Sequence, residues 1–183
     1  DAINAGICLL TEDRKEQGLI LGLSVKENFG LPNLGVFSKN GLIDRNGELN
    51  RFDHYVESIS IKISGPDQLA EKLSGGNQQK VVLAKWLEKN AEILIFDEPT
   101  RGIDVGAKFE IYQWMNRLAK QGKGIIMISS ELPEVLGMSD RIMVLKEGEF
   151  MGKVTNGPDV TQEKLMAMAI GIVDHKESEN ENS

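Results

Sequence analysis

The apolar positions of the chain form short continuous runs that alternate with helix-like segments. The runs GICLL (6–10), ILIF (93–96) and GIIMISS (124–130) carry no charged residue. Such runs are typical of strands that a parallel sheet covers on both faces. Between them, apolar residues recur at spacings of three and four, which indicates α-helices. The alternation predicts an α/β fold with a parallel core sheet.

Several segments carry the spacing or the end signals of helices. One apolar face is formed over 49–59 by Leu49, Phe52, Val56 and Ile59. Ser74 is a suitable N-cap for a second helix that contains VVLAKWLEKN, and a third is expected at about 106–120. Thr161 and Gly171 have the residue types that begin and end the last helix. These signals place helices on both sides of the strand at 93–96.

The C-terminal part reads as a hairpin followed by that last helix. In RIMVLKEGEFMGKV (141–154), Glu147 and Gly148 lie between two strand-like runs and predict a tight turn. Residues 30–90 are expected to form a mainly helical insert. The sequence therefore suggests four parts: a core strand with the loop after it (1–29), a helical subdomain (30–90), the rest of the core (91–172) and a disordered acidic tail (173–183).

Composition narrows the class of protein. The 183 residues are 40% hydrophobic and 27% charged, with a net charge of −7, so a basic nucleic-acid-binding surface is not expected. The single cysteine, Cys8, excludes an internal disulfide and a cysteine-based metal cluster. His54 and His175 are the only histidines, and their separation argues against a histidine metal site. No apolar run is long enough to cross a bilayer.

Two acids follow the central apolar run. Asp97 stands at the carboxyl end of ILIFD, where open α/β sheets bind ligands. In phosphate-transfer sites such an aspartate holds Mg²⁺, and a neighbouring acid, here Glu98, can orient the attacking water. The same letters also fit a strand that ends in a solvated acidic turn.

The segment LSGGNQQK (73–80) has the composition of an anion-binding helix start. Ser74 is followed by Gly75 and Gly76, which leave backbone N–H groups open and have no Cβ to block a phosphate. The positive end of the helix dipole would add favourable electrostatics. A plain glycine loop is the structural alternative.

Together these segments resemble the ATP-binding cassette (ABC) ATPases. LSGGNQQK matches the signature of that family, and ILIFDEPTRGIDVGAK matches its Walker B strand and D-loop. With TEDRK, SVKEN and SSELPEVLGMSDRI, the pattern is similar to the second cassette of tandem sugar-import ATPases, closest to the ribose type. The resemblance implies a P-loop NTPase fold and covers roughly residues 5–171.

The resemblance also implies roles for particular residues toward ATP and Mg²⁺. Asp97 would hold Mg²⁺ through water, and Glu98 would be the catalytic acid that polarises water. Asp104 matches the D-loop acid that crosses the interface between cassettes. The signature residues would contact ATP held by the other cassette, and they are Ser74, Gly75, Gly76 and Asn77.

Three departures from the family pattern matter. The phosphate-binding loop G-x-x-x-x-G-K-[ST] is absent from the 183 residues, and we expect it upstream of Asp1, in a longer chain. Glu12 replaces the Q-loop glutamine, and Ser130 replaces the switch histidine. Because the loop is absent, the 183 residues alone are expected to hydrolyse no ATP. Because Glu12 and Ser130 replace the usual residues, the ATP site built on Asp97 and Glu98 in the longer chain is expected to be slow or mainly regulatory. Without the strand that carries the phosphate loop, open backbone edges are expected on both ILIFDEP (93–99) and GIIMISS (124–130).

The resemblance implies the partners of a sugar importer. These are a first ATPase cassette in the same full-length chain, membrane permease subunits and, indirectly, a periplasmic or extracellular sugar-binding protein. The chain would then lie peripherally on the cytoplasmic face of the cell membrane. One alternative is a soluble ABC-type ATPase acting on nucleic acid or ribosomes, but neither a basic arm nor a long coiled-coil insertion is present. A non-catalytic regulatory cassette is the other alternative.

Overall fold

The computed structural model describes residues 1–172, apart from the side chain of Lys39, and divides into two compact units. Unit 1 comprises Asp1–Ile128, and unit 2 begins at Ser129. The predicted tail at 173–183, which includes His175, lies outside the described residues. The suggested division into four parts stays a prediction.

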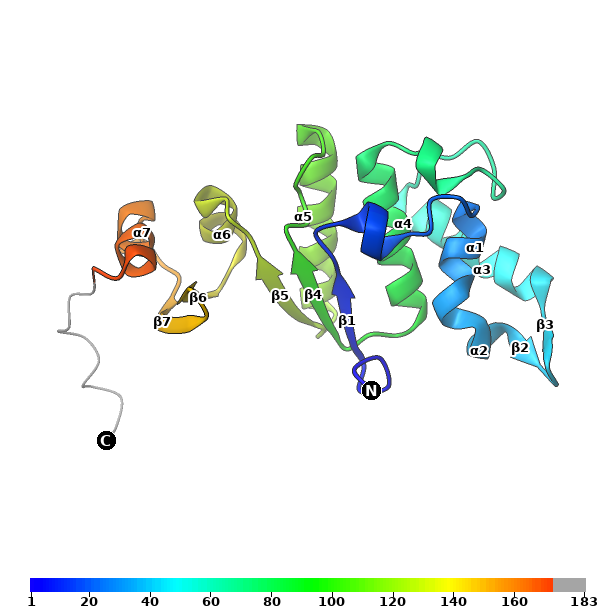
Figure 1. Cartoon of the computed structure of the whole chain (residues 1–183), viewed down its shortest axis with the longest axis horizontal. Helices are drawn as coiled ribbons and strands as arrows, with labels where there is room; N and C mark the ends of the chain where they lie inside the picture. The colour runs from blue at the N-terminus through cyan, green and yellow to red at the C-terminus, as the bar shows by residue number, and fades with distance from the viewer. Residues whose placement is uncertain (173–183) are drawn as a thin grey trace. The chain divides into compact units, whose positions relative to one another are not determined.

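Unit 1 is built on a three-stranded parallel sheet. β1 (Ile7–Leu10) and β5 (Gly124–Ile128) both pair with β4 (Ile93–Asp97), which lies between them (Figure 1). The parallel core sheet is confirmed. The expectation of an open edge on 93–97 is wrong, because β4 has a partner on each side. Within residues 1–172 the free edges of this sheet belong to β1 and β5.

The two faces of this sheet differ in burial. The strand register puts Cys8, Leu94 and Ile125 on one face, where Cys8 and Leu94 are buried. The opposite face carries Leu9 and Ile126, each 44% exposed. The prediction that 6–10 and 124–130 are buried strands is therefore wrong for one face. A continuous apolar run signals burial on both faces, but the helices of residues 1–172 cover the face of Cys8 and Leu94 more completely.

The α-helices α2, α3 and α4 lie within residues 30–90, where a mainly helical segment is expected. α4 packs against β1 and α5 on one side and against α1 and α3 on the other (Figure 1). The α-helices of unit 1 are α1 (Val25–Gly30), α2 (Leu34–Phe37), α3 (Arg45–Ile59), α4 (Gly75–Glu88) and α5 (Val105–Lys120). Shorter elements are the helical turns η1 (Arg14–Gly18), η2 (Leu31–Asn33) and η3 (Ala70–Lys72), and the hairpin of β2 (Ser38–Lys39) and β3 (Leu42–Ile43).

An aromatic cluster joins the helices of this region. Phe29 of α1 is fully buried, and its ring centroid lies 6.0 Å from Phe37, 5.6 Å from Phe52 and 5.5 Å from Tyr55. The α1 helix is fixed at its start by a capping box between Ser24 and the residue three positions on. Tilted ring pairs at these separations add to the burial of apolar area. The cluster fastens α1 and α2 to the predicted apolar face of α3.

Unit 2 contains the predicted hairpin and the last helix. β6 (Arg141–Lys146) and β7 (Glu149–Thr155) are antiparallel, and the turn residues Glu147 and Gly148 have φ of 50° and 85°. Two positive φ values are typical of a tight hairpin turn. A small core forms between α6 (Leu132–Met138), the hairpin and α7 (Gln162–Ile170), with Ile142, Val144 and Leu165 at its centre. Across residues 1–172, no helix combines the length and the apolar character needed to span a membrane.

Candidate functional site

The start of α4 is capped as the sequence predicts. Ser74 has extended φ and ψ of −62° and 155°, and its hydroxyl accepts from the backbone N–H of Asn77 at 3.4 Å. The Asn77 side chain also donates to that hydroxyl at 2.9 Å, while its oxygen accepts from the backbone N–H of Lys62 at 2.8 Å. Ser74 is exposed and Gly75 is half-buried, so the start of α4 reaches the surface of the molecule, whereas Gly76 is buried.

The two glycines of the signature are in close contact with other segments. A Cβ at Gly75 would lie 2.6 Å from Nη2 of Arg14 and 3.2 Å from the carbonyl oxygen of Gly102. A Cβ at Gly76 would lie 2.7 Å from Cβ of Ala107, on α5. Both positions therefore need glycine for packing, in addition to any approach of a ligand.

The lysine of the signature segment points away from the start of α4. Lys80 is buried, donates to the carbonyl oxygen of Ser60 at 2.8 Å and pairs with the carboxylate of Glu110. It thus ties α4 to the end of α3 and to α5. The positive character at the start of α4 comes from its backbone, not from this ammonium group.

Asp97 and Glu98 lie at the carboxyl end of the central strand. Asp97 is the last residue of β4, and Glu98 has a φ of 44°, which is uncommon for a side chain with a Cβ. The backbone N–H of Glu98 donates to the carbonyl oxygen of Ile128 at 2.9 Å. Local strain of this kind persists only where the surroundings fix it, and it is concentrated at functional sites. The strand end therefore presents two adjacent carboxylates on a fixed backbone.

Asp104 has a structural contact that the sequence reading did not predict. It is the N-cap of α5, and its carboxylate accepts from the backbone N–H of Ala107 at 2.9 Å. This hydrogen bond is the largest cause of a pKa of Asp104 below its usual value, and Lys62 also lowers it. The sequence signal was present, because an aspartate directly before a helix is a favoured cap.

Glu12 belongs to a network that joins distant segments. Its carboxylate pairs with the guanidinium of Arg101, in the segment after β4. Two residues further along, Nη1 of Arg14 donates to the carbonyl oxygen of Arg101 at 3.1 Å. Sequence reasoning singled out Glu12 but missed both arginines, whose contacts span almost half of the chain. The structure thus brings the loop after β1, the start of α4 and the segment 101–104 together.

Ser130 lies in unit 2, at the turn that leads into α6. It is exposed, and the hydroxyl of the neighbouring Ser129 donates to the carboxylate of Glu134 and accepts from the backbone N–H of Glu131 at 3.1 Å. These bonds fix the turn into α6. The role of Ser130 as the switch position therefore stays a prediction.

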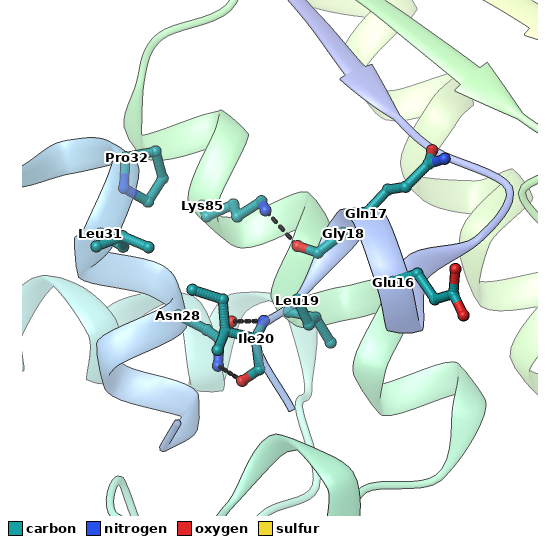
Figure 2. Close-up of a pocket in the computed structure, with 9 residues that line it drawn as sticks. All are labelled: Glu16, Gln17, Gly18, Leu19, Ile20, Asn28, Leu31, Pro32 and Lys85. Carbon is teal, nitrogen blue, oxygen red and sulfur yellow. Dashed lines mark hydrogen bonds between the residues drawn. The ribbon is translucent and has the colours of Figure 1, made fainter. Parts of the chain in front are cut away.

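A pocket of about 310 Å³ lies on another part of unit 1, between residues 16–20, α1 and α4 (Figure 2). The side chain of Asn28 bonds to both the N–H and the carbonyl oxygen of Ile20, at 2.7 and 2.9 Å. Lys85 donates to the carbonyl oxygen of Gly18 and lies over the ring of Trp86, 4.9 Å from its centroid. Lys85 is ten residues from Gly75 along α4, a rise of about 15 Å. The pocket is thus separate from the start of α4.

Replacing Lys85 should change how stability depends on pH. Burial lowers the pKa of Lys85 from 10.5 to about 8. Between those values the unfolded chain binds more protons at this position, so this group makes the unfolding free energy rise with pH. We expect Lys85→Met to be more stable than wild type at pH 7, by on the order of 1 kcal/mol. That difference should shrink by pH 10.

Urea unfolding of both proteins at pH 7 and pH 10 measures this effect. Lys120→Met is the control, because Lys120 is exposed. Its difference from wild type should be the same at both pH values. A Lys85→Met difference that did not change with pH would contradict the expected pKa.

No group of three or more histidine, cysteine, aspartate or glutamate side chains suited to a metal ion occurs within residues 1–172. The donors at the end of β4 are carboxylates, which are ligands that Mg²⁺ prefers. Mg²⁺ usually retains several waters and binds through one or two carboxylates together with phosphates of a substrate. Asp97 and Glu98 fit that kind of partial site.

Comparison with known proteins agrees with the resemblance of the motifs. The chain is 55% identical over 173 residues to a ribose import ATP-binding protein RbsA of Clostridium perfringens, covering 94% of this chain and 34% of that protein. It is 51% identical over 171 residues to the RbsA of Bacillus subtilis, covering 93% of this chain and 34% of that protein. The chain thus spans about a third of the length of these relatives.

Solved structures support the fold. A dimeric post-hydrolysis structure of the ATP-binding cassette MJ0796, bound to ADP and Pi, matches with a TM-score of 0.69 and 24% identity, over 82% of this chain and 63% of that one. A second dimeric structure of the same cassette matches with a TM-score of 0.67. Residues 4–101, more than half of this chain, match the family model described as ABC transporter. The chain belongs to the ABC transporter family.

Proposed function

We propose that this chain is a cassette of a ribose-type sugar importer and that the start of its α4 helix contacts ATP held by another cassette. The observation that carries the proposal is the capped start of α4, where Ser74 is exposed and the bare backbone of Gly75 packs directly against the segment that contains Gly102. Backbone N–H groups at a helix start bind phosphate oxygens. By the resemblance to the family pattern, that phosphate would belong to ATP held by the other cassette.

Mg²⁺ and water would be handled at the end of β4. Asp97 would hold Mg²⁺ through water, and the ion would supply charge stabilisation for the phosphate oxygens. Glu98, fixed by its backbone bond to Ile128, would orient a water molecule. Asp104, already ionised as the α5 cap, would present its remaining oxygen to the interface between cassettes.

The partners follow from the same proposal. The printed name of the relatives, ribose import ATP-binding protein, supports ribose or a related monosaccharide as the transported sugar. The importer would comprise a first cassette, membrane permease subunits and a sugar-binding protein, with this chain at the cytoplasmic face of the membrane. The energy of ATP binding and hydrolysis would be coupled to sugar uptake through these contacts.

The two ATP sites of the importer should differ in activity. Glu12 and Ser130 replace the glutamine and histidine that the family pattern has at those positions, and Glu12 is already paired with Arg101. The site built on Glu98 should therefore be slower than the one completed by α4. In a full-length transporter, Glu98→Gln should reduce ATP hydrolysis less than the equivalent change in the first cassette.

Steady-state ATP hydrolysis of the two variants in liposomes tests this difference. Glu57→Gln, an exposed carboxylate on α3, serves as the control and should retain the wild-type rate. An equal loss from both catalytic variants would contradict the unequal sites. Absence of any ATP hydrolysis in the wild-type transporter would contradict the proposed function as a whole.

A further inference from the structure

The guanidinium of Arg14 contacts two backbone segments, and these contacts are not expected to stabilise the fold. Nη1 donates to the carbonyl oxygen of Arg101 at 3.1 Å, and Nη2 lies against the bare backbone of Gly75. The third nitrogen, Nε, is buried and has no hydrogen-bond partner. A buried donor left unsatisfied costs free energy. The side chain is thus held in place at a cost.

The electrostatic surroundings of Arg14 add to that cost. Its Nη2 lies at the start of α4, where the helix dipole is positive and a cation is unfavourable. The carboxylate of Glu12 pairs with Arg101, and within residues 1–172 Arg14 forms no ion pair of its own. Burial lowers the pKa of Arg14, while Asp13 acts in the opposite direction. A neutral side chain at this position would be expected to suit the fold at least as well.

The contacts of Arg14 instead have a geometric consequence. Arg101 is held twice from the same loop, through its side chain by Glu12 and through its carbonyl oxygen by Arg14. The guanidinium also touches Gly75, and the segment 101–104 leads directly into the cap of α5. A planar guanidinium presents donors in fixed directions, so it can set the separation of two backbones.

We propose that Arg14 is a positioning residue that holds the segment 101–104 against the start of α4, so that Asp104 and the signature residues meet the partner's nucleotide as one unit. This inference rests on the proposed function. It extends that function by assigning a role to Arg14, a residue of the TEDRK segment to which the resemblance gives no role. Arg14 acts through the backbone of Arg101 and Gly75, and it does not itself touch the reacting atoms.

Hydrogen exchange on this chain tests the contact without any need for catalysis. The Arg101 amide donates to the carbonyl oxygen of Glu98 at 3.1 Å and is therefore a suitable probe. In Arg14→Gln the exchange of this amide should be roughly tenfold faster, as expected for losing one hydrogen bond from a charged donor. Lys15→Gln removes the same charge from an exposed neighbour and should leave the exchange unchanged.

Kinetics of ATP hydrolysis in a full-length transporter test whether this positioning affects nucleotide binding. Arg14→Gln should raise KM for ATP by roughly tenfold with little change in kcat, because the nucleotide loses binding contacts that a preformed surface provides. The midpoint of urea unfolding should stay the same or rise. Arg14→Lys keeps the positive charge but lacks the planar set of N–H donors of a guanidinium. Its exchange rate and KM should therefore resemble those of Arg14→Gln and not those of wild type.

Three results would overturn the inference: unchanged exchange and KM in Arg14→Gln, a fall in stability that accounts for the loss, or full rescue by Arg14→Lys. A wild-type transporter without ATP hydrolysis would instead overturn the proposed function. The hydrogen exchange of the Arg101 amide would still decide whether Arg14 holds the segment 101–104.

Discussion

Gly75→Ala should reduce ATP hydrolysis by the assembled transporter by roughly tenfold. The new Cβ would lie 2.6 Å from Nη2 of Arg14 and 3.2 Å from the carbonyl oxygen of Gly102. The arginine can move, but the carbonyl belongs to the backbone of the segment next to Asp104. The start of α4 and that segment would have to separate, and small displacements of positioning groups strongly reduce rates.

A matched glycine separates this effect from a general effect of added side chains. Gly35 is in α2, and a Cβ there would meet no atom within 4 Å. Gly35→Ala should therefore hydrolyse ATP at the wild-type rate. The urea midpoint of Gly75→Ala should stay close to that of wild type, because alanine has a higher helix propensity than glycine and this offsets the crowding. Equal rates in the two variants would contradict the close packing at Gly75.

Phe29→Ala should lower the free energy of unfolding by about 3–5 kcal/mol. Phe29 is fully buried and contacts three other aromatic rings, from α2 and α3. Truncation removes both the buried area and the packing of those rings, and it leaves a cavity among three helices. Such a loss is a large fraction of the stability of a typical domain.

Urea unfolding at neutral pH measures the loss, with Leu42→Ala as the control. Leu42 is 76% exposed in the β2–β3 hairpin, so its truncation should change the unfolding free energy by no more than about 0.5 kcal/mol. A loss below about 1 kcal/mol for Phe29→Ala would mean that the aromatic cluster does not hold the helices together.

Features set by neighbouring residues could be predicted from the sequence. The cap at Ser74, the turn at Glu147 and Gly148, and the end of α7 at Gly171 all occur as expected. In each case the deciding contact lies within a few residues of the chain. The apolar spacing of Leu49, Phe52, Val56 and Ile59 likewise marks the inner face of α3.

Features set by distant residues could not be predicted in this way. The contact of Arg14 with Arg101 depends on how two strand ends meet, and no local pattern indicates it. The exposed face of β5 was missed for a similar reason, since Ile126 is apolar whether or not another segment covers it. The central position of β4 depends on strand order, which short apolar runs do not specify.

In the candidate site, too, some features follow from the local sequence and others only from the structure. The sequence singles out Asp97, Glu98 and the signature residues as candidates, because these residue types occur together at characteristic positions, and their roles stay predictions. It did not reveal the positive φ of Glu98, which depends on backbone conformation. The capping role of Asp104 has a local signal, an aspartate directly before a helix, which sequence reasoning did not use. The interpretation of the site as half of a shared ATP site comes from the resemblance and stays a prediction. The close packing of Gly75 against Arg14 and Gly102 is described only by the structure.

The most direct test of this account is ATP hydrolysis by this chain, alone and after mixing with a separate cassette that carries a phosphate-binding loop. Because the 183 residues contain no such loop, the chain alone should hydrolyse no ATP above background. Mixing with the first cassette of the same importer should produce hydrolysis that Gly75→Ala reduces by the same factor as in the assembled transporter. Robust hydrolysis by the purified chain alone would contradict the central claim that α4 acts on ATP held by a partner.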